Sequence, residues 1–251
     1  MSTQPRPRLI SFTFSHFCEK ARWALDRLGI DYEEELWPLG LHIKLSRQLG
    51  APQSTVPILI DGESILQGSR EILDWAEHHR PGPGPNPEDA AHTQEIRAIE
   101  ARADSVIAVE VRRLLFSQTL TQHPNTILEM MYGDLDDRQK KVGYALWPRV
   151  LPAMIQTLDA GPEAAPAARA KLDAELDWLD ATLADGRQHL IGDCFTRADL
   201  TVASLLSPFS RRAIEHMNRG ISLPPEIERD IERMEKRPAM QWVAGIYRDF
   251  R

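Results

Sequence analysis

Hydrophobic and polar positions alternate at the start of the chain in a way that predicts a strand followed by a helix. Residues 8–14 (RLISFTF) follow the period of two that is typical of a strand. From Glu19 to Leu28 apolar residues recur at helical spacing, and Gly29 is placed to end that helix. The loop Ser15–Cys18 joins the two elements, so the chain opens as strand, tight loop and helix.

The same pattern predicts three more extended segments and two more helices before residue 80. The extended segments are residues 30–36, 56–60 and 64–66, and the helices are residues 41–49 and 70–77. Asp61-Gly62 is a strong hairpin signal between the last two strands. This order predicts a compact α/β unit with a mixed four-stranded sheet, parallel where helices cross over and antiparallel at the final hairpin.

A proline-rich segment separates this unit from the rest of the chain. Residues 80–87 (RPGPGPNP) hold four prolines and two glycines, which neither a helix nor a central strand accommodates. We therefore predict a first domain over residues 1–80, a linker over 81–92 and a second domain over 93–251.

The second domain has helical periodicity throughout. Helices are predicted over residues 93–120, 144–158, 164–183, 196–214, 225–235 and 239–247. Glu110 interrupts the apolar stripe of the first, and Pro148 and Pro152 predict a kink in the second. Thr196 and Asp199 have the spacing of a capping box, which we interpret as a structural helix start.

Composition narrows the class of protein. The 251 residues include 30 Lys or Arg and 37 Asp or Glu, a formal net charge of −7, with no block of five like charges. This disfavours nucleic-acid binding, which depends on clustered cations. The polar N-terminus does not resemble a signal peptide, and no apolar run of about 18 residues could span a membrane.

Cysteine and histidine usage disfavours a disulfide framework and a metal site. The two cysteines, Cys18 and Cys194, are expected to be reduced in a cytoplasmic protein. The eight histidines and two cysteines show no Cys-x-x-Cys or His-Glu-x-x-His spacing, so no metal is expected.

Three local features could carry chemistry, and each has a purely structural alternative. Ser15 could donate a hydrogen bond to a thiolate at a helix N-terminus, Cys18 could itself be a nucleophile, or Ser15 could only cap the helix. A turn at Pro57, through a cis peptide bond, would leave the backbone of Val56 free for an extended peptide ligand, unless Pro57 is an ordinary edge proline. Ser69 could bind a carboxylate or simply cap the next helix.

Taken in order, these features resemble the cytosolic glutathione transferase family, serine-type and bacterial-like, over nearly the whole chain. The resemblance rests on Ser15-x-x-Cys18, Glu19–Arg22, Thr55–Pro57, Gly68-Ser69 and Thr196–Asp199. It implies a thioredoxin-like N-terminal domain followed by an all-α helical domain. It also implies that Ser15 stabilises the glutathione thiolate, that Cys18 occupies the second cysteine position of the thioredoxin-type loop, and that Pro57 is a cis-proline.

The resemblance further implies a glutathione site. Its residues are His42, Lys44, Gln53, Ser54, Thr55, Val56, Pro57, Gln67, Gly68 and Ser69. Within it Val56 would pair with the cysteinyl unit, Ser69 would hold the γ-glutamyl carboxylate, and His42 would attend the glycyl carboxylate, where Ser54 replaces a second histidine. Gly68 departs from the family, which has Glu or Gln there, so Gln67 compensates or glutathione binds weakly. The earliest tyrosine is Tyr32, which disfavours the family's tyrosine-type mechanism.

The resemblance also implies a pocket for an electrophile, a cytoplasmic homodimer, and glutathione as co-substrate without a metal. Candidate pocket residues by position are Phe17, Arg102, Val106, Val109, Arg113 and Phe116, whose alternative is core packing or solvated surface. The leading hypothesis is transfer of the glutathione thiolate to a small hydrophobic electrophile. The alternatives are thiol–disulfide chemistry through Cys18 and a non-catalytic binding or scaffold protein of the same fold.

Overall fold

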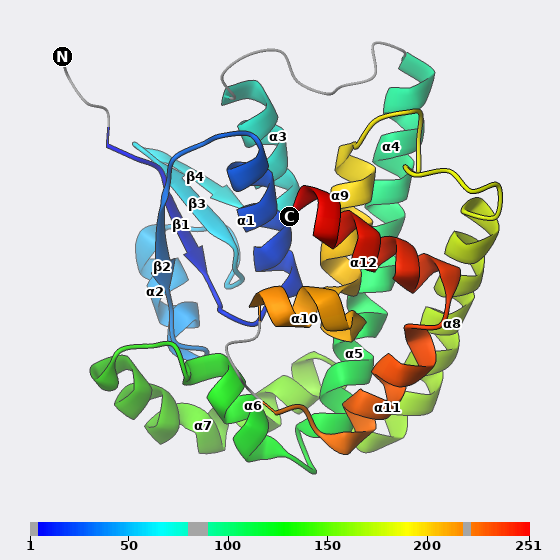
Figure 1. Ribbon diagram of the computed structural model, residues 1–251. Helices are drawn as coiled ribbons and strands as arrows, with labels where there is room; N and C mark the ends of the chain where they lie inside the picture. Colours follow the sequence, from blue (N-terminus) through cyan, green and yellow to red (C-terminus); the bar gives the residue numbers. More distant parts are fainter. Residues whose placement is uncertain (1–4, 80–89, 218–221) are drawn as a thin grey trace. The chain divides into compact units, whose positions relative to one another are not determined.

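The computed structural model describes residues 5–79, 90–217 and 222–251 (Figure 1). Residues 81–89 of the predicted linker lie outside this part, whereas residues 90–92 belong to a helix, and the predicted domain boundaries stay a prediction. Contacts divide the chain into two compact units, residues 1–84 with 128–150 and residues 85–127 with 151–251. Residues 128–150, which we assigned to the second domain, therefore group with the first unit.

The first unit contains a four-stranded sheet in the order β2-β1-β3-β4. Its elements are β1 (Arg8–Ser11), α1 (His16–Arg27), β2 (Glu33–Leu36), α2 (Leu41–Leu49), β3 (Ile58–Asp61), β4 (Ser64–Gln67) and α3 (Ser69–His79), with parts of α6 (Pro124–Tyr132) and α7 (Asp137–Thr157). β1 pairs with β2 in parallel, and β3 pairs antiparallel with both β1 and β4. The mixed sheet is confirmed, but the crossover through α2 returns the chain antiparallel to β1, where we expected a parallel strand.

Alternation along the central strands places helices on both faces of the sheet. Leu9 and Leu59 are fully buried against α1 and α3, with Leu25 and Ile72 in the same cluster. Their neighbours Ile10 and Ile58 point to the other face and pack near Leu45 and Leu49 of α2. Because successive side chains of a strand point to opposite faces, β1 and β3 are buried on both sides.

The second unit is helical, as predicted. Its elements are α4 (Ala90–Arg102), a π-helical turn (Ala103–Ile107), α5 (Ala108–Thr119), a 3-10 turn (Pro162–Ala164), α8 (Ala165–Thr182), α9 (Arg197–Leu206), a 3-10 turn (Ser207–Phe209), α10 (Arg211–Met217), α11 (Pro225–Met234) and α12 (Pro238–Phe250), together with parts of α6 and α7. None of the helices in the described part of the chain is both long and apolar enough to cross a membrane.

All ten residues of α9 are buried, and its first turn contains the predicted capping box. Thr196 Oγ1 accepts a hydrogen bond from Ala198 N at 3.2 Å, and Asp199 Oδ2 accepts one from Thr196 N at 2.7 Å. The second carboxylate oxygen accepts from Leu190 N, so the Asp199 carboxylate also holds the preceding loop. The backbone groups of a buried helix start are therefore satisfied by side chains.

The helices differ from the prediction in several places, and α7 begins at Asp137 where we predicted a start at residue 144. The helix expected over residues 93–120 contains a π-helical turn, in which Ala108 N donates to Ala103 O. The helix expected over residues 196–214 is divided at the 3-10 turn that contains Pro208, because proline has no N–H to continue the helical ladder. α6 was not predicted. α7 continues through Pro148 and Pro152, and the kink there stays a prediction.

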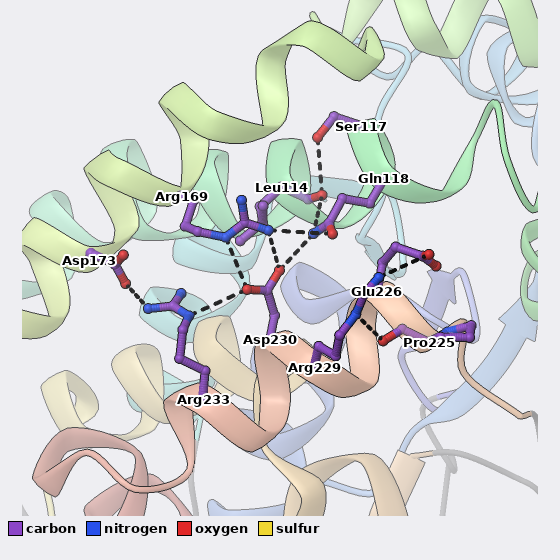
Figure 2. A network of polar contacts seen from close by, with 10 residues as sticks. All are labelled: Leu114, Ser117, Gln118, Arg169, Asp173, Pro225, Glu226, Arg229, Asp230 and Arg233. Atoms are coloured by element: carbon purple, nitrogen blue, oxygen red, sulfur yellow. Dashed lines mark hydrogen bonds and ion pairs between the residues drawn. The ribbon is translucent and has the colours of Figure 1, made fainter.

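A polar network joins α5, α8 and α11 within the second unit (Figure 2). The carboxylate of Asp230 is 4% exposed and accepts hydrogen bonds from Arg169 Nε at 3.0 Å, Arg169 Nη2 at 2.8 Å and Gln118 Nε2 at 2.8 Å. Arg233 Nε lies 3.5 Å from the same carboxylate. Burial alone would raise the pKa of Asp230, but the hydrogen bonds from Arg169 and Gln118 hold that pKa below its usual value.

We predict that Asp230→Asn lowers the free energy of unfolding by about 2 kcal/mol at neutral pH, because Arg169 loses its charged partner in a partly buried place. A carboxylate with a lowered pKa stabilises the folded state above its unfolded value of 3.8 and loses that contribution as pH falls through the folded value. The deficit of the variant should therefore shrink below pH 3.8. Denaturant unfolding at several pH values measures it.

The matched control is Asp249→Asn, which removes an exposed aspartate that pairs with Arg248 on α12. Its free energy of unfolding should stay close to that of the unsubstituted protein, because exposed ion pairs contribute little. An equal loss in the two variants would contradict the role given to Asp230.

Candidate functional site

Ser15 occupies the N-cap of α1, where the chain leaves the central strand. Its backbone is extended, with φ −144° and ψ 118°, and its hydroxyl oxygen accepts a hydrogen bond from Cys18 N at 3.3 Å. The cap uses one lone pair of the oxygen and leaves the hydroxyl proton for a sulfur acceptor, which in this structure is the Cys18 thiol. Capping and donation to a thiolate are therefore compatible roles for Ser15.

Cys18 lies in the first turn of α1 and is fully buried. Phe12 N donates a hydrogen bond to its Sγ at 3.5 Å. Burial raises the pKa of the Cys18 thiol, against the opposing effects of the Arg22 charge and of the hydrogen bond with Ser15. A buried thiol with a raised pKa is a poor nucleophile, because the reactive form is an accessible thiolate.

The Val56–Pro57 peptide bond is cis. Pro57 is buried and directly precedes β3, and its carbonyl accepts a hydrogen bond from Gly68 N at 2.9 Å. Within the described part of the chain, the N–H and C=O of Val56 have no hydrogen-bond partner. This loop therefore offers one donor and one acceptor to an extended peptide backbone.

Gln67, at the end of β4, holds the loop that precedes the cis peptide. Its amide oxygen accepts from Gln53 N at 2.7 Å, and its Nε2 donates to Gln53 O at 2.8 Å and Thr55 O at 2.7 Å. Both amide hydrogens and the amide oxygen are thus engaged within the loop. In this conformation Gln67 has no free group that could replace the side chain missing at Gly68.

Gly68 and Ser69 form the turn into α3. Gly68 has φ +103°, a conformation that residues with a side chain rarely adopt, although a Cβ there would meet no atom within 4 Å. Glycine is therefore favoured by the backbone and not by crowding. Ser69 is buried at the first position of α3, where free backbone N–H groups favour an anion.

His42 lies in the first turn of α2 and is 8% exposed. Its Nδ1 accepts a hydrogen bond from Gly40 N at 2.9 Å, and its ring meets Phe12 edge to face with a centroid distance of 4.9 Å. Burial lowers the pKa of His42 to about 4, although its hydrogen bond to the backbone of Ser54 opposes the shift. The imidazole is therefore neutral at neutral pH and joins α2 to the loop at Ser54. Lys44, two residues further along the same helix, is exposed.

Among the residues predicted to line the electrophile pocket, the two arginines form ion pairs within the protein. Arg102 forms a bidentate ion pair with Glu175, at 2.7 and 3.1 Å, and its guanidinium carbon lies 3.9 Å from the ring centroid of Trp178. Arg113 donates to the backbone oxygen of Asp159 at 3.0 Å and pairs with its carboxylate. Phe116 is buried, whereas Phe17, Val106 and Val109 are half-buried. Their assignment to a common pocket stays a prediction.

Arg22 is the residue near this site to which the sequence analysis assigned no role beyond its place in the family motif. It lies on the inward side of α1, next to the buried Cys18, Ala21 and Leu25, and its side chain is 12% exposed. A charged residue among inward-facing positions of a helix was the available signal. Across residues 5–79, 90–217 and 222–251, no group of three or more His, Cys, Asp or Glu side chains is arranged to hold a metal ion.

Comparison with models of protein families identifies the family of this chain. The model for the glutathione S-transferase N-terminal domain matches residues 9–84, and the model for the C-terminal domain matches residues 162–243, together more than half of the chain. The chain therefore belongs to the glutathione S-transferase family, with a thioredoxin-like domain followed by a helical domain.

A maleylpyruvate isomerase from Ralstonia sp is 34% identical over 96 residues, which is 38% of this chain. The match spans 45% of that relative's length.

Solved structures share the fold. A glutathione transferase from Phanerochaete chrysosporium aligns with a TM-score of 0.63 at 17% identity, over 99% of this chain and 98% of that one. A glutathione S-transferase from Methylobacterium radiotolerans, in complex with glutathione sulfonate, aligns with a TM-score of 0.55 at 21% identity, over 94% and 93%. A bacterial maleylpyruvate isomerase of the zeta class aligns with a TM-score of 0.53 at 24% identity, over 96% and 97%.

We predict that the free energy of unfolding falls as pH decreases from 6.5 to about 4, in part because His42 titrates. The unfolded imidazole takes up a proton near pH 6.5 while the buried one does not, so the unfolded state binds more protons and gains stability. This contribution reaches at most about 3 kcal/mol. His42→Gln should flatten this part of the pH profile in denaturant titrations.

His78→Gln is the control, because His78 is an exposed histidine in the last turn of α3. It should leave the slope of the profile between pH 6.5 and 4 unchanged. An NMR titration that shows His42 protonating near pH 6.5 would contradict its neutral state.

Proposed function

We propose that the protein is a glutathione transferase that adds the glutathione thiolate to an apolar electrophile, or uses it to displace a leaving group. The observation that carries the proposal is the Ser15 hydroxyl at the N-terminus of α1, in the thioredoxin-like domain of a glutathione S-transferase family member. The open backbone of Val56 and the α3 N-terminus at Ser69 belong to the same domain and support a peptide ligand with a carboxylate.

The proposed chemistry is stabilisation of an anion. A free thiol with a pKa near 8.5 is only a few per cent ionised at neutral pH, so lowering that pKa by two units favours the reactive form by about 2.7 kcal/mol. A hydrogen bond from a hydroxyl and the positive end of a helix dipole together have that magnitude. The thiolate would then attack the electrophile, with its electron pair forming the new carbon–sulfur bond.

Glutathione would be bound as an extended peptide. In the proposal the N–H and C=O of Val56 pair with the cysteinyl unit, and the turn at Ser69 holds the γ-glutamyl carboxylate. The exposed Lys44 is the cation for the glycyl carboxylate, because the neutral His42 supplies no charge. The proposed electrophile pocket keeps the residues predicted from the sequence, which are Phe17, Arg102, Val106, Val109, Arg113 and Phe116. A cytoplasmic homodimer remains the proposed form.

A second candidate is glutathione-dependent cis–trans isomerisation, which the sequence similarity to a maleylpyruvate isomerase supports. The first step is the same attack of the thiolate, but glutathione is released unchanged when the double bond re-forms. Consumption of glutathione therefore separates the two reactions: a transferase uses one glutathione per product, and an isomerase uses none.

The burial of Cys18 argues against thiol–disulfide chemistry, the alternative catalytic hypothesis. A fully buried sulfur is closed to a disulfide substrate, and its raised pKa keeps it protonated. A non-catalytic member of the family is the remaining alternative, and Gly68 is the residue that favours it.

We predict that isothermal titration detects glutathione binding with a dissociation constant in the micromolar to millimolar range. Gly68 lacks the side chain that family members have at this place, and Gln67 is fully engaged with Gln53 and Thr55, so binding should be at the weak end of that range. Titration with S-methylglutathione, which has no ionisable thiol, is the control for thiolate formation. No heat of binding at millimolar glutathione would contradict both catalytic proposals.

We predict that Ser15→Ala lowers kcat/KM for conjugation of a chromogenic aryl halide by about 100-fold or more, the usual effect of losing one donor to a reacting anion. Cys18→Ser should leave that rate within about threefold, because the buried sulfur does not meet the substrate. Steady-state rates with glutathione measure both. The opposite pattern, with Cys18→Ser inactive and Ser15→Ala active, would favour thiol–disulfide chemistry instead.

A further inference from the structure

Arg22 is a cation with only 12% of its side chain exposed, in contact with the loop that carries Ser15. It projects from the inward side of α1, where its neighbours Cys18, Ala21 and Leu25 are fully buried. Burying a guanidinium is costly unless hydrogen bonds satisfy it, so the partners of Arg22 show what holds it there.

Those partners form a closed ring across three elements. Arg22 Nη2 donates to Phe12 O at 2.6 Å and to Ser11 Oγ at 3.0 Å, and Arg22 Nε donates to Glu34 Oε1 at 2.6 Å. Ser11 Oγ in turn donates to Glu34 Oε1. The ring therefore joins the end of β1, the second turn of α1 and the middle of β2.

Phe12 is the residue at which this ring meets the loop. Its carbonyl is held by Arg22, its N–H donates to Cys18 Sγ at 3.5 Å, and its ring packs on His42. Both polar groups of one peptide residue are thus fixed to α1. Only two residues separate Phe12 from Ser15, so the place of Phe12 limits where the Ser15 hydroxyl can lie.

We propose that Arg22, oriented by Glu34, is a positioning residue that holds the Ser15 hydroxyl in the geometry needed to donate to the bound glutathione thiolate. The inference rests on the proposed function. Arg22 acts through the backbone of residues 12–15 and does not itself touch the sulfur. Its fork of donors holds Phe12 O and Glu34 at the same time, which the single ammonium of a lysine does not reproduce.

The charge of Arg22 acts on the first turn of α1, as a positioning role beside Ser15 requires. The positive charge of Arg22 lowers the pKa of the Cys18 thiol, against the larger effect of burial, so the charge acts on the start of α1. Two carboxylates compensate that charge: Glu34, whose side chain is 32% exposed and whose Oε1 contacts Arg22 Nε, and the buried Glu19, whose Oε2 lies 3.9 Å from Arg22 Nη1. The ring is therefore a compensated ion pair that orders the loop.

The test measures the pKa of the thiol of enzyme-bound glutathione, from its thiolate absorbance in the ultraviolet as pH is varied. Arg22→Gln should raise this pKa by about one unit, a tenfold loss of thiolate below it. The dissociation constant of glutathione should change less than threefold. At high pH, where the thiol is ionised in both proteins, the conjugation rate of Arg22→Gln should equal that of the unsubstituted protein. A loss of folded protein would instead lower the rate at every pH.

Two further variants separate position from charge. Arg22→Lys keeps the charge but loses the fork, so it should behave like Arg22→Gln; a return to the original pKa would overturn the positioning role. In the Ser15→Ala background, Arg22→Gln should add nothing to the shift in pKa, because both changes act through one hydroxyl. Additive shifts would show that Arg22 acts independently of Ser15 and would overturn the proposal.

Controls separate this inference from the proposed function and from folding. Arg27→Gln removes an exposed arginine from the last turn of the same helix and should leave the pKa unchanged. If Arg22→Gln does not fold, Glu34→Gln removes one partner of the ring and should raise the pKa by about half a unit. If the thiol of glutathione bound to the unsubstituted protein keeps its ordinary pKa, the proposed function itself is refuted. If that pKa is lowered and stays equally low in Arg22→Gln and Glu34→Gln, only the role of Arg22 is refuted.

Discussion

Burial of β1 on both faces is the constraint on which the rest of the first unit depends. Leu9 points to the face covered by α1 and α3, Ile10 points to the face covered by α2, and both are fully buried between strands β2 and β3. With both faces and both edges occupied, the chain leaves the sheet at the end of the strand. After the loop of residues 12–15, α1 begins, and its N-terminus supplies free N–H groups beside the hydroxyl of Ser15.

Buried polar groups then fix details that apolar packing leaves free. The Arg22 ring joins β1 to α1 and β2, the Asp199 carboxylate joins the start of α9 to the preceding loop, and the Asp230 carboxylate joins α5, α8 and α11. Each contact is directional, so it specifies one arrangement where hydrophobic contact alone would permit several. The cost is sensitivity to losing one partner, since the other then stays buried without compensation.

Much of the architecture could be predicted because local patterns and tertiary packing agree. The helix at residues 41–49 has the predicted bounds, the mixed sheet is present, the Val56–Pro57 bond is cis, and Thr196 with Asp199 forms a capping box. The division of the helix at Pro208 was not predicted, because the helical pattern of apolar residues continues on both sides of this proline. The antiparallel course of β3 was missed because a helical crossover of ordinary length does not itself set the direction of the next strand.

For the candidate site, too, some features could be predicted from the sequence and others depend on the tertiary structure. The amino-acid sequence by itself determined which residue types occur at the ends of strands and helices, and so it determined Ser15 at a helix start, Pro57 at a strand entry and Ser69 at a second helix start. Only the tertiary structure decided that His42 is neutral, that Cys18 is enclosed, that Gln67 is engaged with Gln53 and Thr55, and that Arg22 reaches Phe12 and Glu34. The physical reason is that protonation, access and side-chain partners depend on neighbours distant in sequence, and those neighbours are set by the packing of helices on the sheet.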